Sequence, residues 1–253
     1  MKIIIFGGTT EGRIAYTKLT SSNANKVYLF VATELGEKYV SSSRGEVFVG
    51  RLDKSQIKAR LEEISPDIVV DATHIFATEI TQNILDAVSQ AKNKGSISYF
   101  RIKRSIASYE GTAFSSLDEA ISYLEPKSEG ILLTIGTTNL KAFMANNRLR
   151  DRIFVRALDN ELSRENCQKN GLGEDRCFFG EGKPKKSEIK AILSATGARF
   201  LLTKNSGEIG GFGEKISACR EMGVAPIVIM PKEADGISLE ELFKIVEEKN
   251  EKH

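Results

Sequence analysis

Three polar side chains follow a short apolar run in the first half of the chain. The run Ile68 to Val70 ends in Asp71, and Thr73 and His74 follow before a helical pattern begins. In an open parallel sheet, ligands bind at the carboxyl ends of the strands, and these side chains would lie there. Asp71 and Thr73 could instead only cap the helix, and His74 could be a surface residue. Because the three occur together at a strand end, we interpret them as a site.

A glycine turn after the first predicted strand is the second candidate. The strand Ile3 to Phe6 runs into Gly7, Gly8, Thr9, Thr10, Glu11 and Gly12, and apolar residues at helical spacing follow. Glycines at such a turn let a phosphate approach the backbone, and the start of the helix favours an anion. The spacing differs from the usual Gly-x-Gly-x-x-Gly, so a plain tight turn remains the alternative to a dinucleotide site.

An acidic residue follows the second predicted strand. Val27 to Val31 leads to Thr33 and Glu34, and an acid at this distance from the glycine turn usually binds the ribose 2′-hydroxyl. Glu34 would repel a 2′-phosphate, which favours NADH over NADPH. Arg44, in the following loop, could reverse this preference by binding that phosphate.

The second half of the chain has polar groups of its own after two predicted strands. Ile131 to Thr134 is followed by Gly136, Thr137 and Thr138, and Phe200 to Thr203 by Lys204, Asn205, Ser206 and Gly207. A lysine and small hydroxyl residues at such an edge suit a ligand with carboxylates or phosphates. Lys204 could also be an ordinary solvated side chain.

The elements that would position these groups alternate between strands and helices. Such alternation predicts βαβ units and an α/β fold with parallel sheets. If the first sheet has the order 3-2-1-4-5, the glycine turn and the corner at Asp71, Thr73 and His74 face one crevice. We predict two Rossmann-like domains with a cleft between them: residues 1–104, which bind the dinucleotide, and residues 130–253, which contribute to the substrate cleft. Residues 105–129 are less regular and are predicted to connect the two domains.

Composition excludes several classes of protein. Among 253 residues, 36 Lys and Arg balance 34 Asp and Glu, and a net charge of +2 does not indicate a protein that binds nucleic acid by bulk charge. No apolar run reaches membrane length. Three scattered cysteines and a single internal histidine provide no metal-ligand cluster and no disulfide framework, which predicts a cytoplasmic protein.

Five short motifs together resemble those of one enzyme family, the precorrin-6A reductases, including the cobalt-precorrin branch. The resemblance extends from the first strand to the last. It implies two Rossmann-like domains and reduction of a C=C bond in a corrin precursor by NADH or NADPH, in cobalamin biosynthesis. One departure is Ile75, where the family usually has proline. The motifs are Gly7 to Glu11, Asp71-Ala72-Thr73-His74, Arg101-x-x-Arg104, Thr134-x-Gly136, and Thr203 to Gly207 with Lys215 downstream.

The resemblance also implies roles for individual residues. The proton that accompanies the hydride would come from Lys204 or, as second choice, from His74. The substrate would be a tetrapyrrole with several carboxylates, bound by cations and small polar groups. The implied cofactor-binding residues are Gly7, Gly8, Thr9, Thr10, Glu11, Asp71 and Thr73, to which the position after the second strand adds Thr33 and Glu34. The implied substrate-binding residues are Arg101, Arg104, Gly136, Thr137, Thr138, Asn205, Ser206, Gly207 and Lys215.

Two other functions remain open from the sequence. One is a tetrapyrrole-modifying enzyme of similar two-domain architecture that uses no redox cofactor. The other is a non-catalytic binding protein that responds to nicotinamide nucleotides. The second group of polar residues, around Lys204, argues against such a sensor, which needs no second site.

Overall fold

The chain divides into two compact units in the computed structural model, which describes residues 1–32, 44–92, 95–103, 106–207, 210–231 and 235–251. Unit 1 comprises Met1–Arg104 and Glu233–His253, and unit 2 comprises Ser105–Lys232. Thr33, Glu34 and Arg104, which the sequence placed in the site, lie outside the described residues.

Unit 1 is a parallel five-stranded sheet of order β3-β2-β1-β4-β5, the order on which the expected meeting of the two motifs depended. Its central strands are apolar and fully buried because helices cover both faces. The elements are β1 (Lys2–Phe6), α1 (Thr10–Thr20), β2 (Lys26–Val31), β3 (Glu46–Val49), α3 (Lys54–Ile64), β4 (Ile68–Asp71), α4 (Thr78–Gln90), β5 (Ser98–Arg101) and α10 (Leu239–Asn250).

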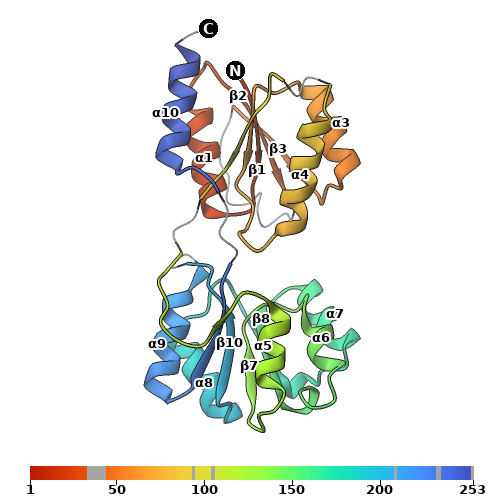
Figure 1. Cartoon of the computed structure of the whole chain (residues 1–253), viewed down its shortest axis with the longest axis vertical. Helices are drawn as coiled ribbons and strands as arrows, with labels where there is room; N and C mark the ends of the chain where they lie inside the picture. The colour runs from red at the N-terminus through yellow and green to blue at the C-terminus, as the bar shows by residue number, and fades with distance from the viewer. Residues whose placement is uncertain (33–43, 93–94, 104–105, 208–209, 232–234, 252–253) are drawn as a thin grey trace. The chain divides into compact units, whose positions relative to one another are not determined.

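The helices of unit 1 form two layers (Figure 1). On one face, α1 and α10 lie side by side, and Tyr16 and Leu19 share a core cluster with Leu242 and Val246. On the other face, α3 and α4 pack against the sheet. The helix starts follow local capping rules: Asp53 and Gln56 form a capping box at α3, and Ser238 and Glu241 form one at α10.

The last helix corrects the predicted domain boundaries. Residues 130–253 were expected to form one domain, but α10 returns to unit 1, where Leu242 is 0% exposed. Ile237 also forms a bridge with Ile102 there. An amphipathic helix is stable only where its apolar face is buried, and unit 1 provides that surface beside α1.

Unit 2 is a parallel six-stranded sheet of order β6-β11-β10-β7-β8-β9. Residues 105–129, predicted to be a connecting segment, contribute its edge strand β6 and helix α5. The elements are β6 (Ala113–Phe114), α5 (Leu117–Leu124), β7 (Ile131–Leu133), α6 (Leu140–Met144), η1 (Arg150–Arg152), β8 (Ile153–Leu158), α7 (Glu161–Lys169), η2 (Glu174–Arg176), β9 (Cys177–Gly180), α8 (Lys186–Thr196), β10 (Phe200–Lys204), α9 (Phe212–Met222) and β11 (Ala225–Ile229).

The two sheets explain why the candidate residues occur where they do. In both units the polar loops follow the carboxyl ends of parallel strands, which all lie at one edge of the sheet. Helices α8 and α9 pack together and share a core cluster with β7 and β10. Across the described ranges, no helix is long and apolar enough to cross a membrane.

Candidate functional site

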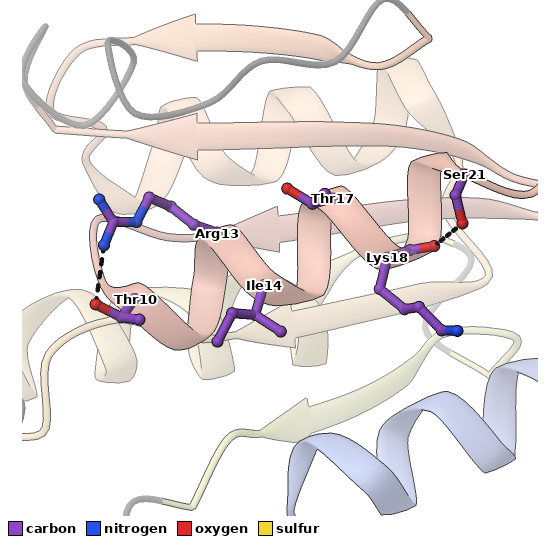
Figure 2. Close-up of a pocket in the computed structure, with 6 residues that line it drawn as sticks. All are labelled: Thr10, Arg13, Ile14, Thr17, Lys18 and Ser21. Atoms are coloured by element: carbon purple, nitrogen blue, oxygen red, sulfur yellow. Dashed lines mark hydrogen bonds between the residues drawn. The ribbon is translucent and has the colours of Figure 1, made fainter.

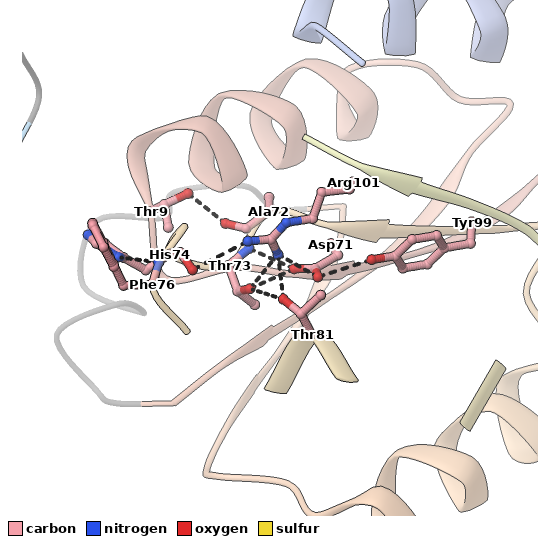
Figure 3. Close-up of polar contacts among 9 residues, drawn as sticks. All are labelled: Thr9, Asp71, Ala72, Thr73, His74, Phe76, Thr81, Tyr99 and Arg101. Atoms are coloured by element: carbon pink, nitrogen blue, oxygen red, sulfur yellow. Dashed lines mark hydrogen bonds and ion pairs between the residues drawn. The ribbon is translucent and has the colours of Figure 1, made fainter. Parts of the chain in front are cut away.

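The glycine turn and the Asp71 corner meet at the carboxyl edge of unit 1, between neighbouring strands β1 and β4. The Thr9 hydroxyl donates to the carbonyl oxygen of Ala72 at 2.7 Å and accepts from the amide of Gly12 at 3.1 Å, which caps α1 (Figure 3). A side chain at Gly12 would reach Ala72 at 3.4 Å and the Gly7 Cα at 3.1 Å, so glycine keeps the two loops together. The predicted convergence of the two motifs is therefore present.

Gly8 is the open point of this turn. Its φ of +99° lies in the region that favours glycine, and a Cβ built there meets nothing within 4 Å. The first turn of α1, which includes Thr10 and Glu11, begins directly beyond it. The combination leaves space for a ligand next to backbone amides at the positive end of a helix.

Asp71 is fully buried, and its carboxylate is occupied by neighbouring groups (Figure 3). One oxygen accepts from the amide and hydroxyl of Thr73, at 3.0 and 2.7 Å. The other pairs with the Arg101 guanidinium and accepts from the Tyr99 hydroxyl at 3.2 Å. Burial and the Asp71 charge raise the pKa of Tyr99, so the phenol stays protonated and donates. Asp71 therefore orients the loop and is too deep for the direct cofactor contact expected from the sequence.

Arg101 was expected to contact the substrate, but its side chain belongs to the same buried network as Asp71. Its side chain is 9% exposed, and Nη1 donates to the hydroxyls of Thr73 and Thr81, each at 2.8 Å. The Asp71 charge balances its own, since the two residues are paired across β4 and β5. Arg101 thus fixes Thr73 and the start of α4. Sequence reasoning missed Tyr99 and Thr81, whose types give no signal without the strand register.

His74 is the accessible member of the corner. It is exposed, its Nδ1 accepts from the Phe76 amide at 3.3 Å, and its ring lies 5.9 Å from that of Phe76 (Figure 3). The buried Arg101 network lies directly beneath this loop, because Arg101 Nη2 donates to the carbonyl oxygen of His74 at 3.4 Å. Of the predicted residues in this corner, His74 is thus the one placed to meet a ligand.

A shallow depression of about 500 Å³ runs along α1 from its first turn (Figure 2). Within it, Arg13 donates to the Thr10 hydroxyl at 2.9 Å, which places an arginine beside the glycine turn that the sequence had not singled out. Arg44, considered above as a phosphate ligand, instead contacts Asn23 and the carbonyl oxygen of Ser21, past the far end of α1. The depression is lined by Thr10, Arg13, Ile14, Thr17, Lys18 and Ser21.

In unit 2 the two predicted loops follow the adjacent strands β7 and β10. Gly136, with φ of +81°, and Thr138 are exposed, whereas Thr137 is buried and accepts from Asn166 at 3.1 Å. Asn205 is 0% exposed and donates to the carbonyl oxygen of Ala107 at 2.7 Å.

Asn205 also accepts from the amide of Gly207, so it shapes its own loop and is not accessible for the expected substrate contact. The buried Gly207 has φ of +72°, as the tight turn requires. Ser206 is partly exposed. Of the residues predicted for this edge, Gly136, Thr138, Lys204 and Ser206 are therefore accessible.

Two lysines of unit 2 have lowered pKa values. Lys204, at the end of β10, is half-buried, and burial lowers its pKa. Lys215, in the first turns of α9, is 5% exposed, and burial together with the nearby Arg156 lowers its pKa to about 8. The residues that the structure describes contain no group of three or more acidic, histidine or cysteine side chains able to hold a metal ion.

Comparisons with known proteins agree with one another. The family model "Precorrin-6x reductase CbiJ/CobK" matches residues 2–247. The chain is 27% identical to the cobalt-precorrin-6A reductase of Priestia megaterium, over 90% of this chain and 89% of that protein. It is 26% identical to the enzyme of the same name from Methanothermobacter thermautotrophicus, over 96% and 80%. The solved structure of CobK precorrin-6A reductase superimposes with a TM-score of 0.75 at 18% identity, covering 98% of this chain and 97% of that one.

Proposed function

Because the chain belongs to the precorrin-6x reductase family, we propose that it reduces a C=C bond of precorrin-6A or cobalt-precorrin-6A to give the corresponding precorrin-6B, in cobalamin biosynthesis. The observation that carries this proposal is the match of the family model over nearly the whole chain. Relatives named cobalt-precorrin-6A reductase align over at least 90% of it, so no large part of the chain is left without a counterpart.

The geometry of unit 1 fits a dinucleotide. The glycine turn lies after β1, next to β4 at the centre of the sheet, and the space above Gly8 is open. Backbone amides at the start of α1 suit the pyrophosphate. Gly7, Gly8 and Thr10 would contact it, while Thr9 caps the helix and Asp71 and Arg101 hold the loop below. A reduced nicotinamide bound there would supply the hydride.

In unit 2, accessible polar groups would bind the substrate carboxylates. Gly136, Thr138 and Ser206 provide backbone amides and hydroxyls along the edge formed by β7 and β10. Asn205 and Thr137 keep these loops in shape from below, through their bonds to Ala107 and Asn166. A substrate with many carboxylates is recognised well by such a combination of amides, hydroxyls and cations.

Lys204 is our candidate for the proton donor. It ends β10 beside Ser206, and its lowered pKa makes the ammonium a better acid than an exposed lysine. His74, exposed at the corner of unit 1, is the second candidate. Arg101 contacts the carbonyl oxygen of His74 but belongs to the buried network, so it acts as a positioning residue.

Comparison of two Lys204 variants tests this role. If Lys204 donates the proton, Lys204→Arg and Lys204→Ala should both lose turnover by about a hundredfold to ten-thousandfold, because a guanidinium does not release its proton near neutral pH. Cofactor affinity should change little. An arginine variant that keeps most of its turnover would reduce Lys204 to a carboxylate anchor. Exposed Lys169, paired with Glu165 in α7, gives the matched control Lys169→Arg.

The proposed activity is tested by incubating the full chain anaerobically with either form of the substrate and NADH or NADPH. Loss of the reduced nicotinamide absorbance and gain of two hydrogen atoms by the macrocycle are expected together. A tetrapyrrole-modifying enzyme without a redox cofactor would not bind NADH or NADPH in a fluorescence titration. A nicotinamide-responsive binding protein would bind them and leave the tetrapyrrole unchanged. The kcat/KM values for NADH and for NADPH then test the preference for NADH, which was expected from the negative charge of Glu34.

A further inference from the structure

Unit 2 holds two buried cations, which contact the loops that follow β9 and β10 through Gly182 and Gly211. Arg156, on β8, and Lys215, on α9, are each 5% exposed. Burial and, as the smaller cause, the charge of Arg156 lower the pKa of Lys215. Buried cations are normally paired, because removing a charge from water is costly unless an opposite charge or hydrogen bonds replace the water.

The partners of these cations do not balance their charge. Arg156 Nε donates to Glu188 at 2.7 Å and Nη1 to the carbonyl oxygen of Gly182 at 2.9 Å. Arg156 Nη2 is buried and has no hydrogen-bond partner, and Lys215 makes no side-chain hydrogen bond or ion pair with any residue that the structure describes. Glu188 thus pairs with Arg156, whereas no carboxylate among the described residues forms an ion pair with Lys215.

The backbone around this group adds to its positive potential. Helices α8 and α9 both begin here, and their N-cap residues, Lys185 and Gly211, make no side-chain hydrogen bond to the helix start. The Glu214 carboxylate accepts from the Lys186 amide at 2.9 Å, so it is engaged at the start of α8. Gly211 packs against the neighbouring loop, since a Cβ there would lie 3.3 Å from Lys183. The two loops thus contact each other at Gly211 and Lys183.

We propose that Arg156 and Lys215 form a receptor for one oxyanion, a carboxylate or a phosphate, which enters between residues 180–185 and 210–212. The anion would balance the charge of Lys215 and accept from Lys215 Nζ and, after a small shift at Gly180, from Arg156 Nη2, which has no hydrogen-bond partner in the described part of the fold. Gly180 is the point of closest packing, because a Cβ there would lie 2.9 Å from both Arg156 Nη2 and Glu188. Glu188, 34% exposed, is the internal competitor of the incoming anion.

In the proposed reductase the receptor would bind one anionic group of the substrate or of the cofactor, and this assignment rests on the proposed function. The anion would be either an acetate or propionate group of the macrocycle or a phosphate of the dinucleotide. Arg156 was not among the residues singled out by the sequence, because an arginine inside a strand gives no signal of a site.

The test uses the full chain without substrate or cofactor, so it does not depend on the reductase assay. Inorganic phosphate and acetate are titrated by calorimetry at mildly acidic pH, where Lys215 is protonated. Lys215→Met should weaken anion binding by about tenfold to a hundredfold, the size expected for one charge-assisted hydrogen bond. Glu188→Gln should strengthen binding, because it removes the competing charge and keeps an acceptor for Arg156. Lys169→Met, which removes an exposed lysine of the same unit, should bind as the wild type does.

Opposite changes in the two variants separate this proposal from structural damage, which would weaken binding in both. Equal affinity in Lys215→Met and wild type would overturn it, as would weaker binding in Glu188→Gln or no saturable binding of either anion. Kinetics of the active enzyme then identify the source of the anion. A higher KM for the tetrapyrrole in Lys215→Met indicates a substrate carboxylate, and a higher KM for the dinucleotide indicates a cofactor phosphate.

Discussion

Asp71 and Arg101 illustrate how a buried ion pair can serve a site without touching its ligand. The pair joins the ends of β4 and β5 and is surrounded by the hydroxyls of Thr73, Thr81 and Tyr99. These groups add hydrogen bonds to both charges, which a buried pair needs. Through the bond from Arg101 to the carbonyl oxygen of His74, the pair also supports the loop that carries His74.

Breaking this pair from one side should be costly. Arg101→Met leaves the Asp71 carboxylate buried without its counterion, and we expect the free energy of unfolding to fall by about 3–5 kcal/mol. Urea denaturation measures the change. The double variant Asp71→Asn, Arg101→Met should recover part of the loss, because no charge is then left unpaired. A loss below about 1 kcal/mol in the single variant would contradict the buried position of the pair.

Lys215 should destabilise the fold in a way that depends on pH. Its pKa is lowered to about 8 from an ordinary value of 10.5, so between these values the unfolded chain holds a proton that the folded protein has lost. Because of this group, the free energy of unfolding therefore increases as the pH rises from about 8 to 10.5. Below that window the buried charge costs the folded state about 3 kcal/mol.

Lys215→Met should accordingly be more stable than the wild type at neutral pH, with the difference shrinking toward pH 10.5. Thermal unfolding across this window measures it, and the other titrating groups cancel in the comparison. The exposed control Lys169→Met should show no such trend. A stability difference that stays constant with pH would show that the ammonium is not buried as described.

At the scale of the elements, the turn between β1 and α1 requires glycine at position 8. Gly8 has positive φ and no atom near its absent Cβ, so Gly8→Ala should cost about 1–2 kcal/mol of stability through backbone strain alone. Cofactor affinity should fall further, because the new methyl occupies the space above the turn. Gly223→Ala, at another open position of positive φ, is the control for strain. Fluorescence titration with unchanged affinity in Gly8→Ala would place the dinucleotide elsewhere.

Helix α10 offers a test of how the chain is divided. Leu242 is 0% exposed within the core of unit 1, and Leu242→Ala should lower stability by about 2–5 kcal/mol. Hydrogen exchange should speed up in β1 and β4 and not in β7, because the cavity forms in unit 1 alone. Leu162, which is 53% exposed in α7, gives the control Leu162→Ala. Faster exchange confined to β7 would assign α10 to unit 2.

Much of the element order could be predicted from the sequence, because buried parallel strands such as β1 and β4 are short apolar runs between helical patterns. β6 was missed since it has two residues. The sequence did contain a signal for α5, because Ser116 is followed by Glu119 at capping-box spacing. In the structure the Ser116 side chain accepts from the Glu119 amide. The contacts within the candidate site were harder to predict. Strand register, which pairs Asp71 with Arg101, and the burial of Lys215 both depend on tertiary packing that no local pattern contains.

At the scale of the whole molecule, the chain first forms the sheet of unit 1, then all of unit 2, and finally α10, which belongs to unit 1. This order has a consequence during synthesis on the ribosome. Unit 2 is one continuous segment, so it can fold as soon as that segment has emerged. The sheet of unit 1 emerges earlier, yet the surface that receives Leu242 and Val246 stays uncovered until α10 has been made. Unit 1 is therefore begun before unit 2 and completed after it, and a chaperone that shields apolar surface would act on the face beside α1.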